Sequence, residues 1–145
     1  MLATVQRVSS AEIVIDGKIF NSINDGCLIF VCVEKDDVSQ NINIMVNKLL
    51  NFRMLDGPKG ITSLPLNNSG KEVLIVSQFT LAAITNKGNK PSFHKAAEPD
   101  NAKLMYDKFV RVFKKSFPNV KEGKFGAFME ISLTNIGPIT FNFKT

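Results

Sequence analysis

The chain has 145 residues, 44% of them hydrophobic and 21% charged, with a formal net charge of +5 at pH 7. This length and balance predict one compact domain over residues 1–145 and exclude a disordered or fibrous chain. No apolar run reaches the length of about 18 residues needed to span a membrane, and the first residues alternate like a strand rather than like a secretion signal. We therefore expect a cytoplasmic protein without a membrane contact.

The chain opens with segments that predict strands. Alternating branched residues or short apolar runs indicate strands over residues 2–8, 11–15, 18–20 and 27–33. Asp16-Gly17 is a two-residue turn signal, so the second and third of these segments form a hairpin. The last segment is apolar throughout, which predicts a central strand buried on both faces.

Two cysteines lie in that central segment. Cys27 and Cys32 are separated by an odd number of positions, which sends their side chains to opposite faces of a strand. They cannot form a disulfide with one another there. We expect two buried free thiols in a reducing compartment.

A helix is predicted next. Apolar residues recur at intervals of three and four over residues 38–52, and Asp37 with Gln40 resembles a capping pair at its start. Turn clusters follow at residues 56–60 and 67–70, and the strand 72–76 comes after them.

The second half predicts one more helix and two closing strands. A polar stretch over residues 85–91 precedes a helical periodicity over 100–115, and alternating residues indicate strands at 125–133 and 139–143, on either side of Gly137-Pro138. The elements predict an α+β fold: a mainly antiparallel, barrel-like sheet with two helices packed on one side, as in a ββα-type sandwich.

Several kinds of catalytic centre are excluded by what the sequence lacks. His94 is the only histidine, and no acid or nucleophile in a recognisable motif lies near it, so a histidine-based triad is not expected. One histidine and two opposed cysteines do not make a metal-ligand cluster. We expect neither a metal nor an organic cofactor.

Polar residues at the end of the strand 72–76 are the first candidates for a site. Ser77, Gln78 and Thr80 place hydroxyl, amide and backbone N–H groups where the sheet opens. On their own they are also compatible with ordinary strand-end residues that are satisfied locally.

Two motifs carry a family resemblance. The segment SQFTL at residues 77–81 and the segment NIGPIT at residues 135–140 resemble the two signatures of the D-aminoacyl-tRNA deacylase family. The likeness covers the whole chain, with further similar stretches at residues 5–8, 33–37, 91–93 and 125–127. The resemblance implies a homodimeric hydrolase that cleaves the ester of D-aminoacyl-tRNA, and also of mischarged glycyl-tRNA, at the tRNA 3′ end.

The resemblance also implies which residues form the site. Catalytic residues correspond to Ser77, Gln78, Phe79 and Thr80, with the N–H groups of Phe79 and Thr80 as oxyanion donors and the ribose 2′-hydroxyl of the substrate as a participant. Substrate-binding residues correspond to Gly137, Pro138, Arg7 and Met129.

Gly137-Pro138 has a particular role in the family. There the bond is cis, and the dipeptide projects into the active site of the opposite subunit, where it excludes L side chains while D side chains and glycine fit. Proline makes a cis bond accessible at a cost of about 0.5–1 kcal/mol. Arg7 corresponds to the arginine that supports this loop.

Two other functions fit the residues. The positive charge suits a non-catalytic tRNA- or RNA-binding module, since Lys and Arg neutralise phosphates. A small-molecule esterase is the third possibility, because no residue by itself specifies a ribose leaving group. Lys87, Lys90 and Lys95 are candidate phosphate contacts.

Overall fold

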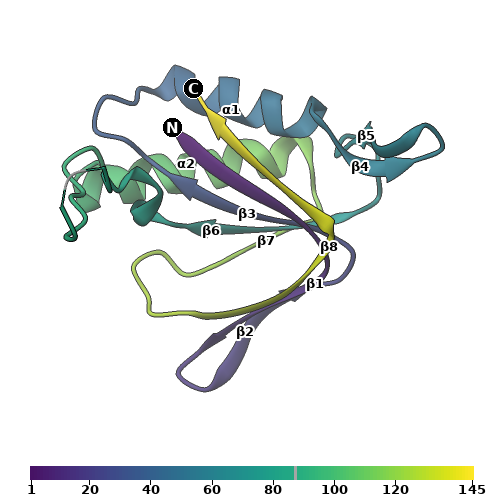
Figure 1. The fold of residues 1–145 in the computed structure, drawn as a ribbon, viewed down its shortest axis with the longest axis horizontal. Coiled ribbons are helices and arrows are strands. Elements are labelled where there is room, and N and C mark those ends of the chain that lie inside the picture. Colours follow the sequence, from purple (N-terminus) through teal and green to yellow (C-terminus); the bar gives the residue numbers. More distant parts are fainter. Residues whose placement is uncertain (87) are drawn as a thin grey trace.

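The computed structural model describes residues 1–86 and 88–145, so Lys87 lies outside the described residues. A six-stranded sheet dominates the fold (Figure 1), with the strand order β2-β1-β3-β6-β7 and with β8 on the free side of β1. The strands of this sheet are β1 (Leu2–Ile15), β2 (Lys18–Ile23), β3 (Gly26–Cys32), β6 (Glu72–Ser77), β7 (Val120–Glu122) and β8 (Glu130–Lys144).

The sheet curls into a nearly closed, barrel-like form because β1 and β8 are long. β1 pairs with β3 through its first half and with β2 through its second half, while β8 runs antiparallel beside nearly all of it. Only the pairs β3–β6 and β6–β7 are parallel, which confirms the mainly antiparallel prediction. The segments predicted as separate strands at 2–8 and 11–15 are one strand, whose pairing register with β8 shifts between Val8 and Ser10.

Both helices pack against the same face of the sheet (Figure 1), as the apolar periodicities predict. They are α1 (Ser39–Asn51) and α2 (Pro99–Ser116). Their buried stripes meet inward residues of β1, β3 and β6 in the larger core, where Phe109 and Phe113 are fully buried. A smaller core fills the inside of the curl, where Ile131 and Leu133 of β8 pack against buried residues of β3 and β6.

The predictions for the central strand are confirmed. β3 lies in the middle of the sheet and is buried along almost its whole length, and Cys27 and Cys32 are buried free thiols. The predicted capping pair is wrong. The Val38 N–H donates to Asn41 Oδ1 at 2.9 Å, while the Asp37 carboxylate accepts the N–H of Glu34 at 2.7 Å.

The closing strands also differ from their prediction. Residues 125–129 form a loop, in which Gly126 turns the chain with a φ of +74°, and this loop lines a cavity. From Glu130 the chain forms one continuous strand, β8, that includes Gly137-Pro138 instead of breaking there.

Four elements were not predicted. A small hairpin of β4 (Arg53–Gly57) and β5 (Gly60–Pro65) forms a separate two-stranded sheet around the predicted turn. β7 adds a short edge to the main sheet. The short 3₁₀ helix η1 (Phe79–Ala82) follows β6 directly. No helix among the described residues is long and apolar enough to cross a membrane.

Candidate active site

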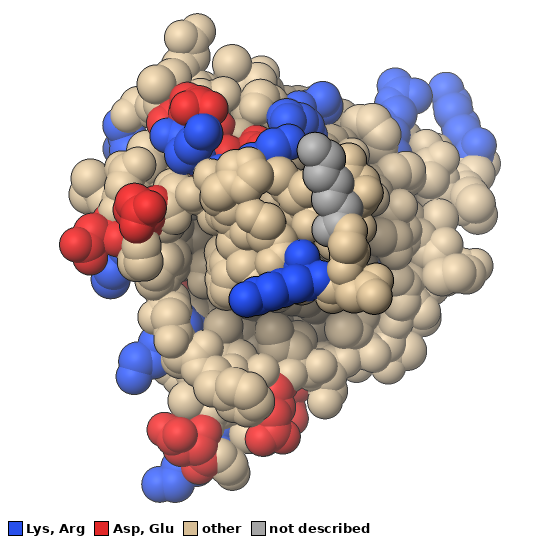
Figure 2. Space-filling view, turned by 60° about the vertical axis from the view of Figure 1, so that its left-hand side comes forward, with Lys and Arg blue, Asp and Glu red and all other residues tan. Residues whose placement is uncertain are grey.

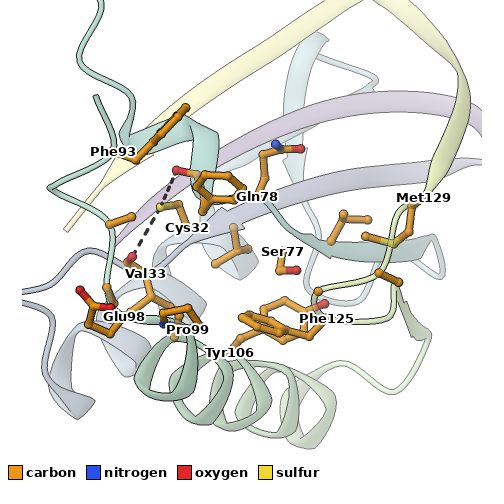
Figure 3. A pocket seen from close by; sticks show the side chains of 18 of the residues that line it. Cys32, Val33, Ser77, Gln78, Phe93, Glu98, Pro99, Tyr106, Phe125 and Met129 are labelled. Carbon is orange, nitrogen blue, oxygen red and sulfur yellow. Dashed lines mark hydrogen bonds between the residues drawn. The ribbon is translucent and has the colours of Figure 1, made fainter. Parts of the chain in front are cut away.

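A cavity of about 600 Å³ opens where β3 and β6 end (Figure 3). These strands are parallel, so their carboxyl ends meet at one edge of the sheet, and the Gln78 N–H donates to Val31 O at 2.8 Å across it. The segment at residues 93–98, the first turns of α2 and the loop over residues 125–129 supply most of the remaining walls. The curl of the sheet and the packing of α2 therefore create the space.

The predicted catalytic segment lies at this edge. Ser77 ends β6 and Gln78 follows it; both line the cavity together with Phe79, the first residue of η1. The exposed Thr80 hydroxyl accepts a hydrogen bond from Gln78 Nε2 and is not itself among the lining residues.

The start of η1 offers backbone donors. The first N–H groups of a helix have no carbonyl behind them within the helix. Within the part of the chain that the structure describes, the N–H groups of Phe79 and Thr80 donate to no backbone carbonyl. A developing oxyanion is the kind of partner that such unengaged amides stabilise.

The walls of the cavity are mainly apolar and include several aromatic rings. Phe79 and Phe93 make an edge-to-face contact with their ring centroids 5.0 Å apart, and Tyr106 packs on Phe125 at 5.7 Å. The Tyr106 hydroxyl donates to Ile75 O at 3.0 Å. Burial raises the pKa of Tyr106, with smaller contributions from nearby carboxylates, so the hydroxyl keeps its proton and acts as a fixed donor to the backbone.

Cys32 lies beside the predicted catalytic segment and is not activated. Its Sγ is 3.6 Å from Phe79 O, and burial raises its pKa to about 11. A thiol is nucleophilic only as the thiolate, which this environment disfavours at neutral pH. Its contact with the Phe79 carbonyl makes it a packing residue under η1.

Gly137-Pro138 lies on β8, away from this cavity. Both residues are exposed, neither lines the cavity of its own chain, and their peptide bond is cis. The side chain of Asn135 holds the backbone around this dipeptide. Its Oδ1 accepts the Ile139 N–H at 2.9 Å, and its Nδ2 donates to Gln6 Oε1 at 2.8 Å.

Arg7, on the neighbouring strand β1, supports the same Gly137-Pro138 segment. Its Nε donates to Ile136 O at 3.2 Å, directly before the dipeptide, and its Nη1 donates to Ile61 O at 2.6 Å. Only 6% of Arg7 is exposed. A buried guanidinium must direct its donors to protein acceptors, and these two carbonyls accept them.

The structure thus divides the predicted residues into two groups. Ser77, Gln78, Phe79 and Met129 line one cavity, and Thr80 is adjacent to it. Gly137 and Pro138 form a second group on β8. The buried Arg7 belongs to it, because the structure brings Arg7 and Gly137 together.

Sequence reasoning missed several residues that line the cavity. Phe93 and Phe125 lie in the stretches at 91–93 and 125–127 that resembled the family, and this likeness could have assigned them to the site. Glu98 and Tyr106 could not be found in that way, because one precedes a helix and the other belongs to the buried helical stripe.

The charge around the cavity is distributed at its margin. Figure 2 views the side where β6 ends and α2 begins; apart from one basic side chain near its centre, the middle of this face is uncharged, and the other basic and acidic side chains lie around it. The predicted phosphate contacts Lys90 and Lys95 are exposed. His94 is also exposed and forms a 2.8 Å hydrogen bond with the Ser92 hydroxyl. Among the described residues, no three His, Cys, Asp or Glu side chains come together as metal ligands would.

Comparison with known proteins points to one family. A family model described as D-Tyr-tRNA(Tyr) deacylase matches residues 4–144. The D-aminoacyl-tRNA deacylase of Francisella tularensis subsp. novicida (strain U112) is 43% identical over 144 residues, which cover 99% of each chain. The protein of the same name from Escherichia coli O1:K1 / APEC is 41% identical over 141 residues, which cover 97% of each chain.

Solved structures agree on the fold. The structure titled c-Myc DNA Unwinding Element Binding Protein superposes with a TM-score of 0.95 at 34% identity and covers 100% of this chain and 99% of its own. A probable eukaryotic D-amino acid tRNA deacylase superposes with a TM-score of 0.85 at 17% identity, covering 98% and 97%.

Proposed function

The chain belongs to the D-Tyr-tRNA(Tyr) deacylase family and is an editing hydrolase of D-aminoacyl-tRNA, and we propose that it acts through backbone donors and a backbone wedge rather than through a catalytic side chain. The observation that carries this proposal is the cavity with unengaged amides at its edge. The substrate is the ester between a D-amino acid, or glycine, and the 3′-terminal ribose of tRNA.

In the proposed chemistry the side chains orient the substrate and the backbone amides stabilise the oxyanion. An aminoacyl ester is activated, and the vicinal 2′-hydroxyl of the ribose can take part in its cleavage. The amides of Phe79 and Thr80 stabilise the oxyanion, while Ser77 and Gln78 orient the ester at the end of β6. Preorganised donors of this kind are worth about 10²–10³ in rate each.

We assign chiral selection to Gly137-Pro138 of a second copy of the chain. The dipeptide is exposed and does not reach the cavity of its own chain, which suits insertion into the cavity of a partner. With the ester and the amine held, an L side chain meets this backbone and a D side chain points away from it. Rejection by a clash discriminates more strongly than attraction for one methylene group, which is worth about 1–3 kcal/mol.

Arg7 and Met129 complete the proposed substrate-binding set. Arg7 is a positioning residue that holds the Ile136 carbonyl and so fixes the adjoining dipeptide. Met129 contributes an adaptable apolar side chain to the cavity wall, which suits substrates with different side chains.

The wider setting follows from the substrate. We propose that residues 1–145 act as one deacylase domain in a homodimer, in the cytoplasm, where tRNA is charged. Light scattering checks the assembly: an active monomer would contradict insertion from a second copy.

Turnover tests the proposal against its two alternatives. Purified protein incubated with D-tyrosyl-tRNA is expected to release free D-tyrosine over many turnovers, whereas an RNA-binding module would only retain the tRNA. Activity on aminoacyl-tRNA should also fall steeply with added salt, because phosphate contacts release counterions. Salt-independent hydrolysis would instead favour an esterase for small neutral esters.

A further inference from the structure

The guanidinium of Arg7 links the dipeptide on β8 to the β4–β5 hairpin. Its Nε end donates to Ile136 O and its Nη1 end donates to Ile61 O, the second residue of β5. Asp56 of β4 adds a carboxylate whose Oδ1 is 3.8 Å from the same Nη1. Arg7 is also the one buried polar or charged residue among those the structure describes.

The hairpin is rooted in the larger core by Met54 and Leu55 of β4, whereas β5 is mostly exposed. β4 and β5 pair only with each other, in a two-stranded sheet separate from the main one. Two-stranded ribbons are marginal on their own, so the position of the tip depends on what it contacts. The Ile61 side chain is exposed while its carbonyl accepts a hydrogen bond from Arg7, so β5 is attached here through its backbone.

We propose that the β4–β5 hairpin is the outer anchor of Gly137-Pro138 and thereby a determinant of chiral selectivity. The inference rests on the proposed function, in which the dipeptide excludes L substrates. A guanidinium is planar and rigid, so a shift of its Nη1 end is transmitted to its Nε end and to the Ile136 carbonyl. Its Nη2 would also lie 3.1 Å from a Cβ on Gly137, so it backs the dipeptide directly.

Selection by exclusion is unusually sensitive to such an anchor. If Gly137-Pro138 can move away from an L side chain, the L substrate binds instead of being rejected. The amides of Phe79 and Thr80 lie elsewhere and still act on the ester. Loosening the hairpin should therefore raise hydrolysis of the L ester and leave hydrolysis of the D ester nearly unchanged. A general loss of stability would lower both rates together.

Gly60→Val is the test variant. Gly60 has a φ of +129° with open space where a Cβ would stand, so a branched side chain acts by straining the backbone next to Ile61. Gly17→Val is the matched control, since Gly17 also has positive φ and open space but lies in the β1–β2 turn. Rates on D- and L-tyrosyl-tRNA are measured for both variants and the wild type.

The expected result is a fall of about tenfold or more in the D-over-L ratio of kcat/KM for Gly60→Val, because small misplacements at a site can cost up to about 10²-fold. Gly17→Val should stay within about twofold of the wild-type ratio. A Gly60→Val protein with the wild-type ratio would overturn the hairpin inference.

Asp56→Lys provides an independent variant in case Gly60→Val does not fold. The Asp56 side chain is 70% exposed, so the substitution is tolerated, and it places a cation near the Arg7 guanidinium. The D-over-L ratio should fall and should recover in high salt, which screens the repulsion. Asp36→Lys, beyond the far end of β3 from Arg7, makes the same charge change and should leave the ratio unaltered.

The two proposals fail in distinguishable ways. Equal hydrolysis of D and L esters by the wild-type protein would contradict the proposed function and, with it, this inference. A wild-type protein that discriminates, together with folded hairpin variants that discriminate equally well, would overturn the anchor alone.

Discussion

Replacing Gly137 with alanine perturbs the proposed wedge with a single methyl group. A Cβ at this position would lie 2.7 Å from Ile139 Cγ1, 3.1 Å from Arg7 Nη2 and 3.2 Å from the Ile139 backbone nitrogen. The φ of +122° is also one that residues other than glycine rarely adopt. The Ile139 side chain must therefore move, and the buried guanidinium and the Ile139 backbone must also give way slightly.

The magnitude follows from these contacts. Backbone in a glycine-only region costs about 1–3 kcal/mol for another residue. For a chain of this size that corresponds to a fall in Tm of about 3–10 °C. Displacing the guanidinium also weakens its bond to Ile136 O, so the dipeptide loses both its conformation and its support.

Thermal unfolding and single-turnover hydrolysis measure the two consequences. Gly137→Ala should unfold at lower temperature and should hydrolyse L-tyrosyl-tRNA at least about tenfold faster relative to D-tyrosyl-tRNA than the wild type does. The reasoning is refuted if the variant keeps the wild-type D-over-L ratio while its Tm falls, because the dipeptide would then be only structural.

Three further outcomes are expected. Thr80→Ala should slow hydrolysis of D-tyrosyl-tRNA by less than about tenfold, because the proposed oxyanion donors are backbone amides that the substitution leaves in place; a loss of about 10³-fold or more would show that the hydroxyl is essential. Lys90→Gln combined with Lys95→Gln should raise KM for aminoacyl-tRNA and reduce the slope of log K against log salt by about 1.5–2, and an unchanged slope in a binding titration would place the phosphate contacts elsewhere. Burial raises the thiol pKa of Cys27 to about 12 and of Cys32 to about 11, from an ordinary value of 9.0. The folded chain therefore binds these protons more tightly than the unfolded chain, so the free energy of unfolding should fall as pH rises from about 9 towards 11 in denaturant titrations, and a double Cys→Ala variant should lose part of that fall.

Much of the fold was predictable because its signals are local. The apolar stripes of α1 and α2 and the continuous apolar run of β3 predicted their burial correctly, since periodicity records which face is turned to the core. The hairpin β4–β5 was missed because its strands are short, its alternation is weak and two of its apolar side chains, Ile61 and Leu64, are exposed.

The closing strand shows where local signals mislead. Phe125 and Ala127 alternate as a strand would, but they belong to a loop whose residues 125–129 all line the cavity. Gly137-Pro138 has the pattern of a break between strands, and pairing with β1 is interrupted there, yet it is present up to Asn135 and again from Thr140, so β8 continues past the dipeptide. Tertiary contacts overrode the local preference in both places.

The candidate site was predictable only as two separate motifs. The sequence order indicated that Ser77–Thr80 end a strand, and the family resemblance supplied their role. Arg7 donates to Ile136 O, 129 positions away along the chain, and to Ile61 O, 54 positions away. No pattern of spacing in one sequence encodes such contacts.

Parallel hydrolysis of D-tyrosyl-tRNA and L-tyrosyl-tRNA by the wild-type protein tests the central claim most directly. Both substrates carry the same side chain, ester and tRNA, so only the configuration at one carbon differs. Selection by exclusion predicts rapid release of D-tyrosine, release of glycine from glycyl-tRNA, and an L ester that decays no faster than it does without protein. Equal release of D- and L-tyrosine would contradict the account.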